Sequence, residues 1–275
     1  MTPEIDRIIE AALKEDMPNG DITSESLIPA ESISRAIFLA KEDGVLAGID
    51  VAARVFWKID PKIVFKKDVE DGSAIKAGDT LAQLEGSSIS LLKGERTALN
   101  FLQRMSGIAT LTQRFVRTLE GSKTKILDTR KTTPSLRTLE KYAVTMGGGT
   151  NHRLNLSDMV LIKDNHLKIV GSIAEAVKRA RDRVGRGIKI EVETTSLEEV
   201  KEAVHAGADM IMLDNMAPDK MREVVRWVKG RVPLEASGNV TLSTLKEISA
   251  SGVDFISVGE LTHSYRSLDI SLEFL

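Results

Sequence analysis

Cationic side chains surround one short apolar run of this sequence, at residues 159–162. The cluster comprises Arg130, Lys131, His152, Arg153 and Lys163, with Arg137 and His166 as further candidates. Cations brought this close together repel one another unless an anion lies between them. Each charge-assisted hydrogen bond to such an anion contributes about 1.5–3 kcal/mol. The pattern therefore predicts a receptor for a ligand with several carboxylate or phosphate groups.

The histidines in this chain do not form a zinc motif. There is no HExxH sequence and no close histidine pair with an acid, so zinc is not expected. His152 taken alone is better explained as a core or capping residue than as a ligand. His205 precedes Gly207 near the end of a predicted helix, where a C-terminal capping role is sufficient.

Acidic residues alternate with apolar ones in the run IKIEVE, at residues 188–193. In a strand, this alternation turns Glu191 and Glu193 to one side together with Lys189. If that side is the interior, the carboxylates need cations or a metal ion, because unpaired buried charge is costly. Lys163 and Lys189 are the candidate partners. The alternative is a solvated edge strand with its glutamates outward.

Two further strand ends carry small residues suited to phosphate. Ser237-Gly238-Asn239 follows one apolar run, and Gly259 follows the next. Each is followed by a turn rich in Thr and Ser or by a helix start, where backbone N–H groups bind phosphate. The alternative is a tight turn with an ordinary helix cap. Asp214 ends the strand before these two and is the remaining acid of the predicted site.

The positioning elements are alternating strands and helices after residue 125. The apolar runs predict strands at 125–128, 159–163, 188–193, 210–214, 232–236 and 255–258. Helices are expected at 196–206, with a capping box from Ser196 to Glu199, at 217–229 and at 241–251. The last four strands end at 193, 214, 236 and 258, about one βα unit apart. This spacing indicates a parallel sheet wrapped by helices. At least six such units, without a dinucleotide-type GxGxxG, favour an α/β barrel, whose chemistry gathers at the carboxyl ends of its strands. A flavodoxin-like open sheet is the alternative.

The first 120 residues have a different pattern. Thr2 and Pro3 predict a helix start, and the apolar stripe that follows ends at PNGD, residues 18–21. Residues 34–86 are expected to form short strands separated by turns, and residues 88–120 have helical periodicity.

The composition limits the class of protein. The chain has 275 residues, 42% of them hydrophobic, which is enough for a substantial core. A net charge of −2 argues against nucleic-acid binding through bulk positive charge, and the absence of Cys excludes disulfides. There is no signal-peptide pattern and no apolar run of membrane-spanning length, so a cytoplasmic protein is expected.

At these same residues the chain resembles the quinolinate phosphoribosyltransferases, also called nicotinate-nucleotide pyrophosphorylases (carboxylating). The matching stretches are GDITS (20–24), ERTALNFLQRMSGIAT (95–110), DTRKTTPSLRTLEKYAV (128–144), GGGTNHRLNLSDMVLIKDNH (147–166), EVE (191–193), MLDN (212–215), ASGNV (236–240) and VGELTHS (258–264). They are long, occur in order and run through most of the chain.

The resemblance implies an incomplete, open α/β barrel at residues 106–264 and a smaller N-terminal α/β sandwich domain at residues 1–105. It also implies that residues 265–275 pack back onto the N-terminal domain. Members of the family form homodimers or higher homo-oligomers in which an arginine reaches the partner's active site. The matching position is Arg96.

The reaction implied by the resemblance is phosphoribosyl transfer from phosphoribosyl pyrophosphate (PRPP) to the ring nitrogen of quinolinate. Decarboxylation follows, giving nicotinate mononucleotide, pyrophosphate and CO₂ in NAD biosynthesis. Quinolinate would be bound by Arg96, Arg130, Lys131, His152, Arg153 and Lys163, the 5-phosphate by Ser237, Gly238, Asn239 and Gly259, and the ribose by Glu193 and Asp214. Magnesium would be held by Glu193 and Asp214, directly or through substrate or water. The implied catalytic residues are Lys131, Lys163, Glu193 and Asp214, and no nucleic-acid or membrane partner is expected.

Two residues depart from the family pattern, and two rival functions remain open. Asn239 stands where a second glycine is expected, and Glu260 stands where a small residue is common.

One rival function is that of a paralogous phosphoribosyltransferase acting on another aromatic acid. The other is a lipoyl or biotinyl carrier module, suggested by the turn-rich stretch 71–86. Its Lys76, however, lacks the DK or MK setting of such modules.

Overall fold

The computed structural model describes residues 2–275, which form two compact units. Unit 1 takes in the chain up to Gln113, then Thr132–Gly148 and Ser264–Leu275. Unit 2 consists of Arg114–Lys131 and Gly149–His263. Within the described residues, no helix is long and apolar enough to cross a membrane.

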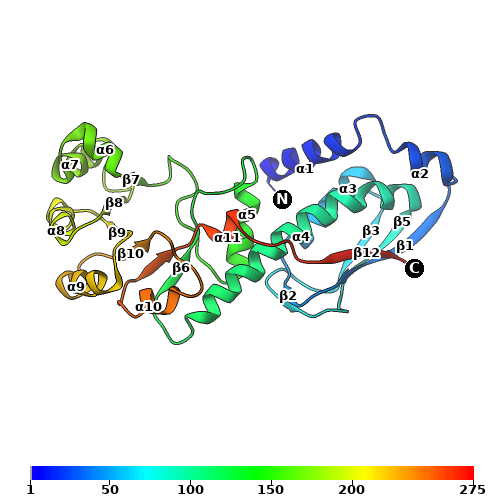
Figure 1. The fold of residues 1–275 in the computed structure, drawn as a ribbon. Coiled ribbons are helices and arrows are strands. Elements are labelled where there is room, and N and C mark those ends of the chain that lie inside the picture. Colours follow the sequence, from blue (N-terminus) through cyan, green and yellow to red (C-terminus); the bar gives the residue numbers. More distant parts are fainter. Residues whose placement is uncertain (1) are drawn as a thin grey trace. The chain divides into compact units, whose positions relative to one another are not determined.

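Unit 1 is an antiparallel sheet combined with helices (Figure 1). Its elements are α1 (Pro3–Asp16), α2 (Ile22–Leu27), β1 (Ile33–Ala40), β2 (Gly44–Val45), α3 (Ile49–Ile59), β3 (Val64–Lys67), β4 (Ala74–Ile75), β5 (Thr80–Ser87), α4 (Ser88–Thr118), α5 (Arg137–Met146) and β12 (Ile270–Phe274). The main sheet has the order β12-β1-β5-β3, and β2 pairs with β4 separately. Because β12 pairs with β1, the C-terminal tail lies in the same unit as the N-terminal strands.

The core of unit 1 is built on alternating strand residues and one helix that the sequence analysis did not predict. Phe38 of β1, Phe56 of α3 and Phe65 of β3 form an aromatic cluster with ring centroids 6.1–6.2 Å apart. Residues 34–86 were expected to contain only short strands, so the helix α3 corrects that expectation. Its N-terminus is capped from a distance by Asp71, which accepts the N–H groups of Gly48 and Ile49.

The first helix and the long helix agree with the sequence. Thr2 Oγ1 accepts the N–H of Ile5, and Pro3 occupies the first turn of α1. The helix α4 is 31 residues long and lies within residues 88–120, where helical periodicity predicted a helix. Lys76 lies in the turn between β4 and β5. Because these two strands pair with different partners, the turn is not the hairpin tip that a carrier module would need.

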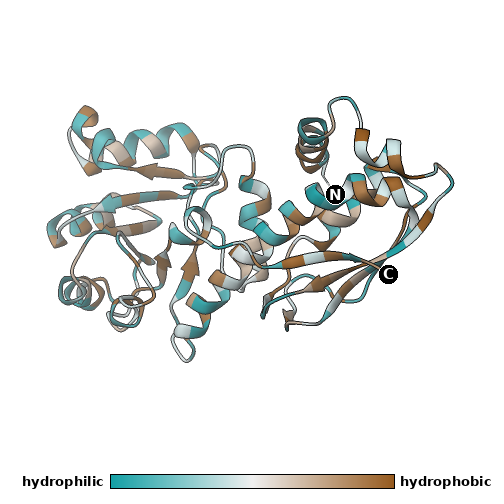
Figure 2. Ribbon diagram, turned by 45° about the vertical axis from the view of Figure 1, so that its right-hand side comes forward, coloured by the Kyte–Doolittle hydropathy of each residue, from teal (hydrophilic) through white to brown (hydrophobic). Residues whose placement is uncertain are grey.

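Unit 2 contains a six-stranded parallel sheet with helices (Figure 1). Its elements are β6 (Lys125–Leu127), β7 (Val160–Ile162), α6 (Asp164–Val170), α7 (Ile173–Val184), β8 (Ile190–Thr194), α8 (Leu197–Ala206), β9 (Met210–Asp214), α9 (Pro218–Val228), β10 (Leu234–Ser237), α10 (Leu245–Ser249), β11 (Phe255–Ser257) and α11 (Glu260–His263). All six strands were predicted, with ends shifted by one or two residues. In Figure 2 the strands of both units are mainly brown, the hydrophobic end of the scale.

The strand order identifies an open barrel rather than a flavodoxin-like sheet. The order is β6-β11-β10-β9-β8-β7, so consecutive strands are neighbours from β7 to β11, and β6 joins β11. This is the order of a barrel whose first two strands do not pair. The fold is an incomplete α/β barrel with a smaller N-terminal α/β sandwich, as predicted.

The helices of unit 2 begin and end at the residues that the sequence marks. Ser196 Oγ accepts the N–H of Glu199, as half of the predicted capping box requires. Glu199 instead accepts the N–H of Thr195, at 2.6 Å. Gly207 ends α8 in the left-handed conformation, with φ of 82°.

The division into units differs from the predicted boundary between residues 105 and 106. The helix α4 is continuous across that point and belongs to unit 1 as far as Gln113. Residues 132–148 return to unit 1 as well. One reason is the buried Glu140 on α5, which accepts hydrogen bonds from Arg104 on α4.

Candidate active site

The predicted site residues of unit 2 follow the strands of the barrel. They are Arg130 and Lys131 after β6, Lys163 after β7, Glu193 in β8, Asp214 in β9, Ser237 in β10 with Gly238 and Asn239 after it, and Gly259 after β11. Parallel strands share one carboxyl edge, so these residues lie at the edge where barrel enzymes place their chemistry. Arg96 lies in unit 1, on an exposed part of α4.

Lys163 and Glu193 form the ion pair expected between β7 and β8. Lys163 Nζ lies 2.5 Å from Glu193 Oε2, and the Glu193 side chain is 12% exposed. The Lys163 backbone N–H donates to Nδ1 of His166, so that ring caps α6. Lys189 was expected in the same cluster, but this was wrong: it is exposed and precedes the first residue of β8, at the opposite end of the strand.

Arg130 and Arg153, called the arginine pair below, lie near enough in this unit for their charges to interact. Burial, together with the positive charge of Arg130, lowers the pKa of Arg153. Arg153 Nη1 donates to the carbonyl oxygen of Met159 at 3.0 Å, which fixes one side of its guanidinium. Two like charges held together in this way favour an anion that can contact both.

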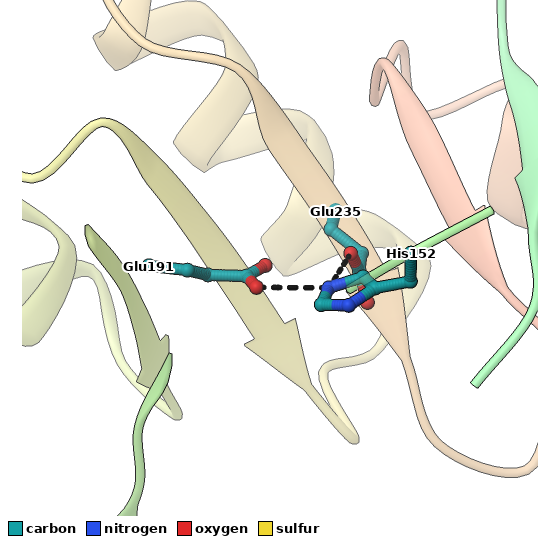
Figure 3. A group of neighbouring side chains, drawn as sticks. All are labelled: His152, Glu191 and Glu235. Carbon is teal, nitrogen blue, oxygen red and sulfur yellow. Dashed lines mark hydrogen bonds and ion pairs between the residues drawn. The ribbon is translucent and has the colours of Figure 1, made fainter. Parts of the chain in front are cut away.

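His152 points into the barrel and lies between two buried glutamates (Figure 3). Its Nε2 lies 2.9 Å from Glu191 Oε2 and 3.2 Å from Glu235 Oε2. The His152 side chain is 8% exposed and both glutamate side chains are fully buried. The inward orientation of Glu191 agrees with the alternation of its strand. Its pairing with His152 was not predicted, nor was the role of Glu235.

The charge state of this cluster is set by burial and by the two carboxylates. Burial lowers the pKa of His152, but the hydrogen bonds to Glu191 and Glu235 outweigh it and raise the pKa to about 9. The Arg153 N–H donates to Nδ1 of the ring, which favours the neutral imidazole and opposes this rise. Burial raises the pKa of Glu191 to about 7, although His152 opposes that change. Because Nδ1 accepts the Arg153 N–H, the ring in this geometry carries its single proton on Nε2, between the carboxylates of Glu191 and Glu235.

The loop after β10 has an unusual backbone that explains one departure from the family pattern. Gly238, Asn239 and Asn215 all have positive φ, of 101°, 50° and 52°. The Asn215 N–H donates to the Ser237 carbonyl at 2.8 Å, which ties the ends of β9 and β10 together. Asn239 stands at the expected glycine position, and asparagine tolerates the left-handed conformation better than most residues.

The end of β11 brings together Gly259, Lys131 and one residue that was not assigned to the site. A Cβ on Gly259 would lie 3.0 Å from both Lys131 Cδ and His263 Nε2. Thr262 Oγ1 donates to the Lys131 carbonyl at 2.9 Å, which fixes the backbone there. The sequence placed His263 only within a polar turn. Its position one helical turn after Gly259 was the available signal. Glu260, the other departure from the family pattern, begins α11 and is half-buried.

Comparisons with known proteins cover nearly the whole chain. The model of the quinolinate phosphoribosyl transferase N-terminal domain matches residues 21–106, and that of the C-terminal domain matches residues 108–273. A probable nicotinate-nucleotide pyrophosphorylase [carboxylating] from Bacillus subtilis is 44% identical over 270 residues, covering 98% of this chain and 93% of the relative.

Solved structures give the same result. NadC from Streptococcus pyogenes matches with a TM-score of 0.96 and 42% identity, covering 100% of this chain and 99% of that one. The nicotinate-nucleotide pyrophosphorylase from Francisella tularensis matches with a TM-score of 0.96 and 38% identity, covering 100% and 98%. Both family models and relatives of this identity span the site residues described above, so the chain belongs to the quinolinate phosphoribosyltransferase family.

Proposed function

We infer that this chain transfers a phosphoribosyl group from PRPP to the nitrogen of quinolinate and releases CO₂, giving nicotinate mononucleotide for NAD biosynthesis. The observation that carries this is the placement of an arginine pair, a Lys163–Glu193 ion pair and a loop with consecutive positive φ values at the strand ends of one barrel. Quinolinate carries two adjacent carboxylates, and PRPP carries a sugar phosphate. The arrangement supplies cations for the first and a small-residue loop for the second.

We assign the quinolinate carboxylates to Arg130, Arg153 and Lys163, with Lys131 nearby. His152, the other expected contact, is left out because its Nε2 faces Glu191 and Glu235 and its side chain is 8% exposed. Arginine forms two parallel hydrogen bonds with a carboxylate, so the arginine pair can fix the ring plane as well as bind charge. Fixing the plane aims the ring nitrogen at C1 of the ribose. Positioning of this kind can lower a barrier by several kcal/mol.

Glu193 and Asp214 face the sugar in this assignment, and Ser237, Gly238, Asn239 and Gly259 hold its 5-phosphate. The two acids can accept hydrogen bonds from ribose hydroxyls and stabilise positive charge that develops at C1 as pyrophosphate leaves. Lys131 adjoins Gly259 and adds positive charge beside the phosphate loop, and the His263 ring adjoins the same glycine.

The acids also fit a magnesium ion held with substrate or water. Magnesium prefers oxygen ligands and keeps several waters. Asp214 accepts a hydrogen bond from the neutral amide of Asn215, which leaves its negative charge for a cation. Glu193 is already paired with Lys163, so we assign it a contact through water or substrate. When bound, magnesium would neutralise the departing pyrophosphate.

The residues need no further cofactor for the second half of the reaction. Attack by the ring nitrogen on C1 breaks the bond to pyrophosphate and makes the ring a pyridinium. The bond from the ring to the adjacent carboxylate then breaks, its electron pair stays on the ring carbon next to the positive nitrogen, and that carbon takes a proton. Lys163 holds the carboxylate during attack without a covalent bond, so CO₂ can leave.

A direct assay tests the proposed function. Purified protein with PRPP and magnesium should convert quinolinate to nicotinate mononucleotide and release CO₂ in equal amounts, as measured by chromatography and carboxyl labelling. Nicotinate in place of quinolinate should give little product, because it lacks the second carboxylate. Turnover of nicotinate or another aromatic acid, but not of quinolinate, would identify the paralogous enzyme instead.

We further propose that the protein acts as a homodimer in which Arg96 enters the partner's site. Its exposure on α4 leaves the guanidinium accessible to a second copy. Arg96→Ala and Lys163→Ala homodimers should each be nearly inactive. Mixed and reassembled, they should recover roughly one quarter of wild-type activity, because half of the dimers are hybrids with one intact site of two. Full activity of the Arg96→Ala protein would contradict this assignment.

A further inference from the structure

We propose that Glu191 and Glu235 are positioning residues for substrate binding. They hold the imidazole of His152 inside the barrel, and His152 in turn fixes the backbone that carries Arg153. This inference rests on the proposed function and adds to it two glutamates that themselves touch no substrate.

The segment that carries His152 lies at the opening of the incomplete barrel. One edge of β6 pairs with β11, and its other edge has no neighbour in the sheet. Thr150 forms a parallel bridge with Leu127 there, donating its N–H to the Ile126 carbonyl and accepting the N–H of Asp128. Residues 150–152 therefore extend the sheet by a few residues at the position where a closed barrel would have its next strand.

From that edge, His152 reaches across the interior. Its backbone N–H donates to Asp128 Oδ1 at 2.8 Å, which ties it to the end of β6. Its ring Nε2 lies within 3.2 Å of Glu191 Oε2 and Glu235 Oε2, which come from β8 and β10 (Figure 3). One residue thus links three strands, no two of which are neighbours in the sheet.

The link continues into Arg153. Its backbone N–H donates to His152 Nδ1 at 2.8 Å, and its guanidinium donates to the Met159 carbonyl at 3.0 Å. Residues 154–158, which follow, are exposed. The imidazole is therefore the contact from the barrel interior that holds the backbone of Arg153. Without the two carboxylates, the ring loses both of these contacts at Nε2, and with them its fixed orientation.

Stability alone does not explain these glutamates. Glu191 Oε1 and both carboxylate oxygens of Glu235 are buried without a hydrogen-bond partner among residues 2–275, although Glu235 Oε2 lies 3.2 Å from His152 Nε2. Buried charges of this kind cost several kcal/mol each, and apolar replacements of whole clusters are often neutral or stabilising. A cluster that does not favour stability is better explained by the geometry that it imposes on Arg153.

The same three side chains could in principle hold a metal ion, since their ligand atoms lie within 4.8 Å of one another. The hydrogen bond from Arg153 N–H argues against this. Nδ1 must carry a lone pair to accept that bond, so a neutral ring carries its proton on Nε2. A protonated Nε2 donates to the carboxylates and offers no lone pair to a metal.

The test compares Glu235→Gln and Glu191→Gln with wild type in steady-state assays of both substrates. Each variant should raise the KM for quinolinate about tenfold, the equivalent of 1.4 kcal/mol of carboxylate binding. The KM for PRPP should stay within about twofold. The phosphate loop begins two residues after Glu235, but the hydrogen bond from the Asn215 N–H to the Ser237 carbonyl fixes it separately. Hydrogen–deuterium exchange should be faster at 150–158 and unchanged at 237–240.

A matched control separates positioning from general destabilisation. Thr124 is buried at the start of β6 and donates to the Val253 carbonyl at 2.8 Å. Thr124→Val should lower the melting temperature without changing either KM. If Glu235→Gln does not fold, Glu235→Asp keeps the charge and should still raise the KM for quinolinate selectively.

Several outcomes would overturn the proposal. It fails if the glutamine variants keep the wild-type KM for quinolinate, or if both KM values rise together with a fall in melting temperature. Stoichiometric metal in the wild type, lost from Glu235→Gln, would make the cluster a metal site instead. A wild type without any turnover of quinolinate overturns the proposed function itself, which distinguishes that failure from the others.

Discussion

Replacing Lys163 with alanine should lower kcat at least about 100-fold, which corresponds to roughly 2.7 kcal/mol of lost transition-state stabilisation. Lys163 lies 2.5 Å from Glu193, whose side chain is 12% exposed. Without the lysine, a nearly buried carboxylate would remain without this partner next to a doubly negative substrate. The variant therefore loses a cation that contacts quinolinate and gains a repulsion. Pre-steady-state assays with quinolinate and PRPP would separate the loss in chemistry from the loss in binding.

Two variants serve as controls for this result. Lys163→Arg keeps the charge but not the shape, so its kcat should fall between those of wild type and alanine. Lys168 lies on α6 and pairs with Asp164 on the surface, with side chains 70% and 59% exposed. Such pairs contribute little, so Lys168→Ala should be as active as wild type. Normal turnover by Lys163→Ala would remove Lys163 from the catalytic residues.

Replacing Gly238 with alanine should raise the KM for PRPP by about 30-fold or more. The new Cβ would lie 2.2 Å from Asn215 Oδ1, far inside van der Waals contact, and φ at this position is 101°. Either Asn215 or the loop backbone must move, and both adjoin the proposed phosphate position. A displacement of this kind costs about 1–3 kcal/mol and misplaces the N–H groups that would bind phosphate.

Gly207→Ala is the matched control. Gly207 also has positive φ, of 82°, but a Cβ there meets nothing within 4 Å. Its replacement should cost about 1 kcal/mol of stability and leave the KM for PRPP unchanged. Inhibition by inorganic phosphate offers an independent measure, since it should weaken in Gly238→Ala but not in Gly207→Ala. Equal KM values for the two variants would place the phosphate elsewhere.

The predictions from sequence were most accurate where local pattern and burial act together. The strand at 190–194 shows this, because alternation within IKIEVE placed Glu191 on the inward side, where the structure has it fully buried. The same alternation failed for Lys189, because the pattern does not state where a strand begins. Lys189 comes one residue before β8, at the amino end of the strand and therefore away from the carboxyl edge.

The helix α3 was missed for a different reason. Its cap comes from Asp71, more than 20 residues away along the chain, rather than from a neighbouring side chain. Helix signals in a sequence come from residues next to the helix. A helix that is capped by a distant residue therefore lacks the capping signal that would predict it.

Taken by itself, the sequence determined the barrel and the residue types available at its carboxyl edge. The period of the apolar residues and the spacing between strands are properties of short segments. These two properties largely specify the order of the strands in a parallel sheet. Only the tertiary structure decided which of those residues meet. His152 is joined to Glu191 and Glu235 across 39 and 83 positions, and Asn239 adopts a glycine-like conformation beside Asn215. Such contacts depend on strand register and loop path, which arise when the whole sheet assembles and not from any single stretch of chain.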